Sequence, residues 1–78
     1  MPNIKLYDYI EHKTGMSIGE LIADSPERFS VIRTEAIRDL VVMNRIADTD
    51  YTVEMPSEVL ENPECERLSH DIPYIIAD

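Results

Sequence analysis

The longest helical pattern in the chain reads PERFSVIRTEAIRDLVVMNRIA and covers residues 26–47. Its apolar side chains recur at intervals of three and four residues, which is the spacing of one helix face. Ser25 supplies a hydroxyl that can cap this helix, and Pro26 fits the first helical position because its missing N–H is not needed there. We expect a long helix with a core-facing stripe made of Phe29, Ile32, Ala36, Leu40, Met43 and Ala47, widened by Ile37 and Val41.

Two shorter helices are expected before the long one. Asn3 can cap a helix that runs from about residue 4 to residue 13, and Gly15 can end it in a left-handed conformation. Ser17 and Glu20 have the spacing of a capping box, which marks the start of a second, short helix. Three helices that share an apolar seam are the simplest outcome of these signals.

The rest of the chain has an extended pattern. Apolar and polar residues alternate over residues 51–55, which predicts a half-buried strand, and Pro56 places that strand at a sheet edge or ends it. Asn62 and Pro63 favour a short helical turn. Residues 73–77 are expected to form a second strand that pairs antiparallel with the first.

Together these patterns predict a single small domain over residues 1–78, with a helical half (1–47) and an acidic, more extended half (48–78). The fold class is α-rich α+β, with a three-helix N-terminal half and a small C-terminal two-strand segment. A chain this short buries only about 60% of its unfolded surface, so a partner or a second copy would add stability. A homodimer therefore stays open.

Charge divides the chain more sharply than structure does. The protein has 16 acidic and seven basic residues, giving a net charge of −9. Residues 1–46 hold seven acids and six bases, whereas residues 47–78 hold nine acids and one base, Arg67, for a net charge of −8. Such asymmetry suggests a solubilising surface or a surface that recognises something basic.

Several functional classes lack their sequence signals. There is no Gly-rich phosphate loop, nucleophile elbow or His-Glu-x-x-His motif, so we expect no enzyme and no cofactor. Cys65, His70 and Asp71 are too few ligands for zinc, so no metal is expected. The single cysteine favours a reducing compartment, the cytoplasm, and no apolar run reaches the length of a membrane span.

A helix-turn-helix regulator is the alternative interpretation. Residues 17–23 and 29–40 loosely resemble the two helices of such a motif, with Arg33 and Arg38 on the recognition helix. A net charge of −9 argues against direct nucleic-acid binding, because that affinity comes from cations that neutralise phosphates. In this interpretation the protein is antitoxin-like, and its acidic segment neutralises a basic toxin.

Our main hypothesis is a non-enzymatic acidic protein that inhibits a basic, nucleic-acid-handling partner protein. Carboxylates on an ordered scaffold can occupy a cationic groove in place of phosphates, and tyrosines add apolar contact. Size and charge are typical of phage-encoded inhibitors of host or defence machinery. The expected contact surface comprises Asp48, Asp50, Glu54, Glu58, Glu61, Glu64 and Glu66, with Tyr51 and Tyr74 as apolar anchors.

Overall fold

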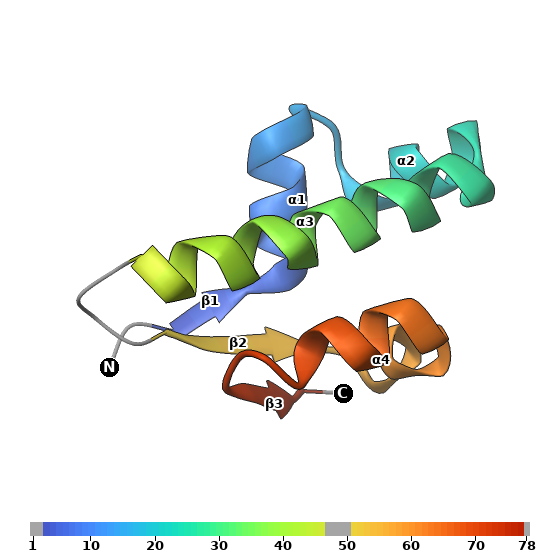
Figure 1. Ribbon diagram of the computed structural model, residues 1–78. Coiled ribbons are helices and arrows are strands. Elements are labelled where there is room, and N and C mark those ends of the chain that lie inside the picture. The colour runs from blue at the N-terminus through green and yellow to red at the C-terminus, as the bar shows by residue number, and fades with distance from the viewer. Residues whose placement is uncertain (1–2, 47–50, 78) are drawn as a thin grey trace.

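The computed structural model describes residues 3–46 and 51–77 (Figure 1). Its fold is α-rich α+β: the N-terminal half is helical, as expected, and a small sheet joins the two ends of the chain. In chain order the elements are β1 (Asn3–Lys5), α1 (Leu6–Thr14), α2 (Ile18–Asp24), α3 (Pro26–Ile46), β2 (Thr52–Met55), the 3-10 helix η1 (Ser57–Glu61), α4 (Pro63–Ser69) and β3 (Tyr74–Ile76).

The long helix α3 organises the molecule as its sequence predicts. It begins at Pro26, where the Ser25 hydroxyl accepts a hydrogen bond from the N–H of Arg28 at 3.2 Å. α3 packs against α1, α2 and α4, and it is the long green helix that crosses Figure 1. Ile32 and Met43 are partly buried against the core, and Ala47 lies outside the described residues. The buried side chains of α3 are Phe29, Ala36, Ile37, Leu40 and Val41.

The sheet is parallel throughout, with strand order β1-β2-β3. Val53 of β2 is in register with Ile4 of β1 and with Tyr74 of β3. Our expectation of antiparallel pairing between residues 73–77 and residues 51–55 was therefore wrong. The helices η1 and α4 lie between β2 and β3 and return the chain to the end at which β2 begins, so β3 enters in the same direction.

The N-terminus forms a strand where we expected the first helix to begin. Asn3 belongs to β1, and α1 begins at Leu6 with Lys5 at its N-cap and no capping side chain. Pairing with β2 supplies backbone partners from 49 positions further along the chain, and local helical preference cannot anticipate such partners. The predicted end of the helix is confirmed, because Gly15 adopts a φ of 74° and its N–H donates to the carbonyl of Glu11 at 2.8 Å.

The start of α2 combines a predicted cap with one that was not predicted. The Ser17 hydroxyl accepts a hydrogen bond from the N–H of Glu20 at 3.2 Å, as the capping-box spacing requires. The N–H of Ile18 donates to the carboxylate of Glu11 at 2.8 Å. Because Glu11 belongs to α1, this bond also links the first two helices.

The two faces of the sheet differ in character. Along β2, Val53 and Met55 are fully buried, whereas Thr52 and Glu54 alternate with them and are half-buried. Both crossovers step in the same direction across the sheet, so right-handed connections place α1–α3 and α4 on one side. β2 is the middle strand, which corrects the edge position suggested by Pro56, although Pro56 does follow its last residue.

Replacing Leu40 should show how much the core depends on α3. The side chain is 1% exposed, so Leu40→Ala leaves a cavity and should lower the free energy of unfolding by about 2–4 kcal/mol. Urea denaturation followed by circular dichroism measures the loss. Val42→Ala is the matched control on the same helix, since Val42 is 49% exposed, and it should change stability by less than about 0.5 kcal/mol. Equal losses would contradict this assignment of the core.

The two glycines should respond to alanine with opposite signs. Gly15→Ala places a side chain on left-handed backbone and should cost about 1 kcal/mol. Gly19 lies inside α2 with open space around its Cα, so Gly19→Ala should stabilise by about 0.5–1 kcal/mol. Thermal unfolding of the two variants measures both effects, and a stabilised Gly15→Ala would refute the left-handed cap.

Candidate functional site

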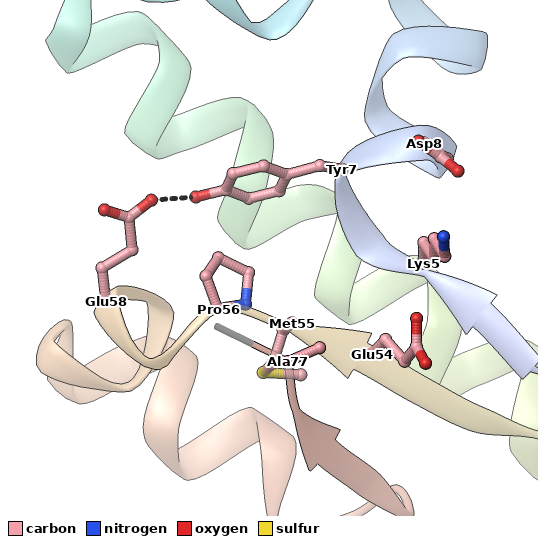
Figure 2. A pocket seen from close by; sticks show the side chains of 8 residues that line it. All are labelled: Lys5, Tyr7, Asp8, Glu54, Met55, Pro56, Glu58 and Ala77. Atoms are coloured by element: carbon pink, nitrogen blue, oxygen red, sulfur yellow. Dashed lines mark hydrogen bonds between the residues drawn. The ribbon is translucent and has the colours of Figure 1, made fainter.

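An open cleft of about 440 Å³ lies at the carboxyl ends of the strands (Figure 2). Lys5 ends β1, Met55 ends β2, and Ala77 follows β3, so each strand contributes to the cleft. This convergence follows from the parallel sheet, in which all strands end at the same edge. We call it the acidic cleft, and its lining comprises Lys5, Tyr7, Asp8, Glu54, Met55, Pro56, Glu58 and Ala77.

The acidic cleft combines negative charge with apolar surface. Asp8, Glu54 and Glu58 bring three carboxylates against the single ammonium of Lys5. Glu54 is held in place by a hydrogen bond from the side-chain amide of Asn3 at 2.9 Å. Between the carboxylates lie Met55, Pro56 and the ring of Tyr7 (Figure 2). This pairing suits a cation carried on an aliphatic stem, such as the side chain of lysine or arginine.

Tyr7 is the best-anchored side chain of the cleft. Its hydroxyl donates to a carboxylate oxygen of Glu58 at 2.6 Å (Figure 2). Its ring meets Phe29 edge-to-face, with 5.8 Å between centroids and an interplanar angle of 79°. Arg33 donates to the Tyr7 hydroxyl at 3.5 Å, and its guanidinium carbon lies 5.4 Å from the centre of the Phe29 ring. Contacts from α3 and η1 thus fix a side chain of α1.

The electrostatics around Tyr7 favour its protonated form. Partial burial raises the pKa of the Tyr7 phenol, and the hydrogen bond to Glu58 raises it further, against an opposing effect of Arg33. Burial also raises the pKa of Tyr9, with a contribution from the charge of Asp39. The hydrogen bond from Lys13 to Asp39 raises the pKa of that lysine.

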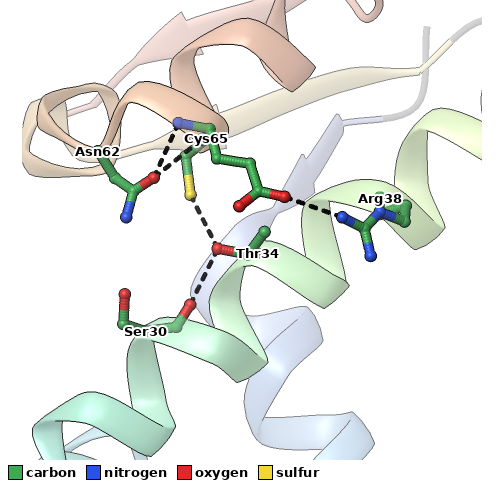
Figure 3. Close-up of polar contacts among 6 residues, drawn as sticks. Ser30, Thr34, Arg38, Asn62 and Cys65 are labelled. Atoms are coloured by element: carbon green, nitrogen blue, oxygen red, sulfur yellow. Dashed lines mark hydrogen bonds and ion pairs between the residues drawn. The ribbon is translucent and has the colours of Figure 1, made fainter.

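A second group of acids is used inside the molecule, between α3 and α4. Arg38 bonds Glu64 at 2.9 Å (Figure 3), and Arg45 bonds Asp71 at 3.3 Å. Both pairs span 26 positions in sequence, because α3 and α4 run in the same direction. Arg38 and Glu64 are about half exposed, and a surface pair of this kind contributes at most about 1 kcal/mol. These carboxylates align two helices.

The same interface buries the only cysteine. Cys65 is fully buried, and its Sγ lies 3.4 Å from the Thr34 hydroxyl (Figure 3). That hydroxyl also bonds the carbonyl of Ser30 at 3.0 Å. Asn62 caps α4 as predicted, accepting from the N–H groups of Glu64 and Cys65 at 3.0 and 3.2 Å. The contact is structural packing between α3 and α4.

The expected contact residues are dispersed over the fold. Of the nine, the acidic cleft brings together Glu54 and Glu58. Glu61 ends η1 and is exposed, and Glu66 of α4 bonds His70, the C-cap of that helix, at 2.8 Å. Tyr74 is half-buried in β3 and packs against the core.

The other four expected contact residues complete this account. Tyr51 is half-buried just before β2, and Glu64 bonds Arg38 at the α3–α4 interface. Asp48 and Asp50 lie outside the described residues. The sequence therefore predicted the charge of this half of the chain, but the fold divides that charge between the cleft and α4.

Sequence reasoning linked Glu54 and Glu58 to this site and missed its other polar residues, Lys5, Tyr7 and Asp8. Asp8 and Tyr7 were assigned to a helix in the other half of the chain, and neither was linked to the acidic segment. The signal that could have found them is the polar–apolar–polar order of residues 3–5, which fits a short strand. A strand there would have placed the residues after it beside the end of β2.

Comparison with protein-family models, curated proteins and solved structures found no match. Within residues 3–46 and 51–77, no three His, Cys, Asp or Glu side chains are grouped so that they could hold a metal ion. Among those same residues, no helix combines the length and the apolar character needed to cross a bilayer.

Alkaline pH should destabilise the protein through these groups. Because the folded-state pKa values of Tyr7, Tyr9 and Lys13 are raised, folding holds their protons, and that stability is lost as pH rises above about 10. We expect the free energy of unfolding to fall steadily between about pH 10 and pH 12. Tyr7→Phe should have a lower free energy of unfolding near neutral pH, and that free energy should fall less than the native value as pH rises. Urea titrations at each pH test this, and an identical alkaline loss in both proteins would contradict it.

Proposed function

We propose that this chain is a non-enzymatic acidic binding protein that inhibits a basic, nucleic-acid-handling partner protein. The observation that carries the proposal is the net charge of −8 in residues 47–78. Two acids of that segment, Glu54 and Glu58, line the acidic cleft together with Asp8. In this proposal the carboxylates take the place of phosphates in the partner's groove, as phage-encoded inhibitors of host or defence machinery can do. Such an inhibitor would act in the cytoplasm of the cell that contains its target.

The acidic cleft supplies the chemistry that a basic side chain needs. An arginine or lysine entering it would meet the carboxylates of Glu54 and Glu58 and lay its aliphatic stem on Pro56 and the ring of Tyr7. Glu58 is held by the Tyr7 hydroxyl, so part of its position is fixed before a partner arrives. A preorganised acceptor costs less entropy on binding than a mobile one.

The proposed contact surface is smaller than the acidic half. Glu64 and Asp71 are engaged with Arg38 and Arg45, which leaves them less available to a partner. Glu61 is exposed on the same 3-10 helix as Glu58 and extends the surface from the cleft. We therefore centre the surface on Asp8, Glu54, Glu58 and Glu61.

The contacts of Arg33 and Arg38 support the helix-turn-helix regulator less well than the inhibitor. Arg38 is paired with Glu64, and Arg33 is half-buried against Phe29 and Tyr7. Reading DNA would require both side chains to leave these partners. A gel-shift assay with the chain alone separates the two proposals, because only the regulator should retard DNA.

Neutralising the cleft should abolish inhibition without unfolding the protein. The immobilised chain first captures its partner from a lysate of its source, and the partner is then assayed for binding to a fluorescent oligonucleotide. The double variant Glu54→Gln/Glu58→Gln should be needed at a concentration at least about tenfold higher than the native chain to displace that oligonucleotide. A change of this size corresponds to the loss of two charge-assisted contacts of modest strength. The amide oxygen introduced by Glu58→Gln can still accept the Tyr7 hydrogen bond.

The matched control is Glu20→Gln with Glu27→Gln, which changes the net charge equally at exposed positions of α2 and α3. It should leave displacement unchanged. Direct binding of the native chain to the captured partner, measured without oligonucleotide, should also weaken as salt is raised from about 0.1 to 1 M, since screening shortens the reach of the charges. If the control loses as much as the cleft variant, only bulk charge matters, and the cleft proposal fails.

A further inference from the structure

The outer edge of β3 is an exposed, apolar strand edge. In the described sheet, β3 pairs with β2 on one side and with nothing on the other. The N–H of Val53 donates to the carbonyl of Pro73, and the N–H of Ala77 donates to the carbonyl of Met55, each at 3.0 Å. Because backbone groups alternate along a strand, the N–H and C=O of Tyr74 and Ile76 then point away from β2.

This edge lacks the charged side chains that often prevent strands from pairing. Residues 72–77 carry no charge, and Ile75 and Ile76 are 45% and 42% exposed. The opposite edge of the sheet is β1, where exposed Lys5 supplies the kind of charge that protects an edge strand. An uncharged edge strand with two exposed isoleucines presents a ready template for another strand.

We propose that the edge of β3 pairs antiparallel with β3 of a second copy of this chain. With Ile75 on the two-fold axis, Tyr74 of each copy lies opposite Ile76 of the other, and each such pair exchanges two backbone hydrogen bonds. Ile75 meets its own counterpart at the closely spaced, non-hydrogen-bonded position between them. The product is a continuous six-stranded sheet in the order β1-β2-β3-β3-β2-β1.

Charge favours a second copy over a basic peptide as the occupant of this edge. The paired segment is uncharged on both sides, so it offers a cationic strand no carboxylate of its own, whereas the same apolar segment matches its isoleucines. Two chains of net charge −9 still repel each other at longer range. Salt should therefore strengthen this dimer, whereas it should weaken binding to a basic partner at the acidic cleft. The dimer does not depend on the proposed function.

Sedimentation equilibrium of the purified chain tests the proposal. Because the contact is short, we expect the average mass to rise from 9.0 kDa toward twice that value between about 10 µM and 1 mM, and at lower concentration in higher salt. Ile76→Lys should raise the dissociation constant at least about tenfold, since a charge then stands at the edge. A native chain that stays at 9.0 kDa throughout overturns the proposal.

Val31→Lys is the matched control. Val31 is 58% exposed on α3, and its replacement changes charge and apolar area in the same way, away from the sheet. Both lysine variants reduce the net charge from −9 to −8, which by itself favours association, so a loss confined to Ile76→Lys identifies the edge. A dimer that survives Ile76→Lys, or that is lost equally in Val31→Lys, overturns the proposal.

Hydrogen exchange of the native chain gives a second measurement that needs no variant. Pairing covers the outward N–H groups of Tyr74 and Ile76, so their exchange should slow at least about tenfold between dilute and concentrated samples. Amides of β1, at the other edge of the sheet, should not change with concentration. Exchange rates at Tyr74 and Ile76 that are independent of concentration while the mass doubles would place the dimer interface elsewhere and overturn the proposal.

Discussion

The parallel pairing of β2 with both ends of the chain is the constraint on which the rest of the structure depends. Ile4 and Tyr74 lie on either side of Val53, so strands from the start and the finish of the chain share one central partner. A parallel neighbour requires a crossover, and here the crossovers are α1–α3 and then η1 with α4. Because both step the same way, the helices gather on one face and pack into one core.

This arrangement also determines where chemistry can occur. Parallel strands end together, so residues that follow β1, β2 and β3 surround one cleft. Asp8 and Glu58 lie 50 positions apart in sequence, yet they line the same cavity. At the interface between α3 and α4 the carboxylates have another role. Arg38 and Arg45 form ion pairs with Glu64 and Asp71, and these pairs connect the two helices. Acidic residues from one stretch of sequence thus serve two purposes.

The sequence predicted those parts of the fold that depend on local signals. Local signals act within a few residues, so spacing alone reveals them. They include the helix caps at Ser17, Ser25 and Asn62, the helix end at Gly15 and the core stripe of α3. The first strand and the direction of the third depend on partners 49 and 21 positions away, which no local pattern encodes. The same holds for the candidate site. Its negative charge was predicted, but the residues that line it were not, because Tyr7 and Asp8 are placed there by β1, the strand that was not predicted.

The position of β1 has a consequence for how the protein forms during synthesis. Asn3 leaves the ribosome long before Thr52, its register partner, and β3 follows later still. The helices α1 to α3 contain mainly local contacts and can assemble early, whereas the sheet waits for the last strand-forming residues. Until then the apolar side chain of Ile4 and the underside of the helices have no sheet to cover them. A nascent chain of this design exposes its future core until β3 has been synthesised, which is when a chaperone would have most to protect.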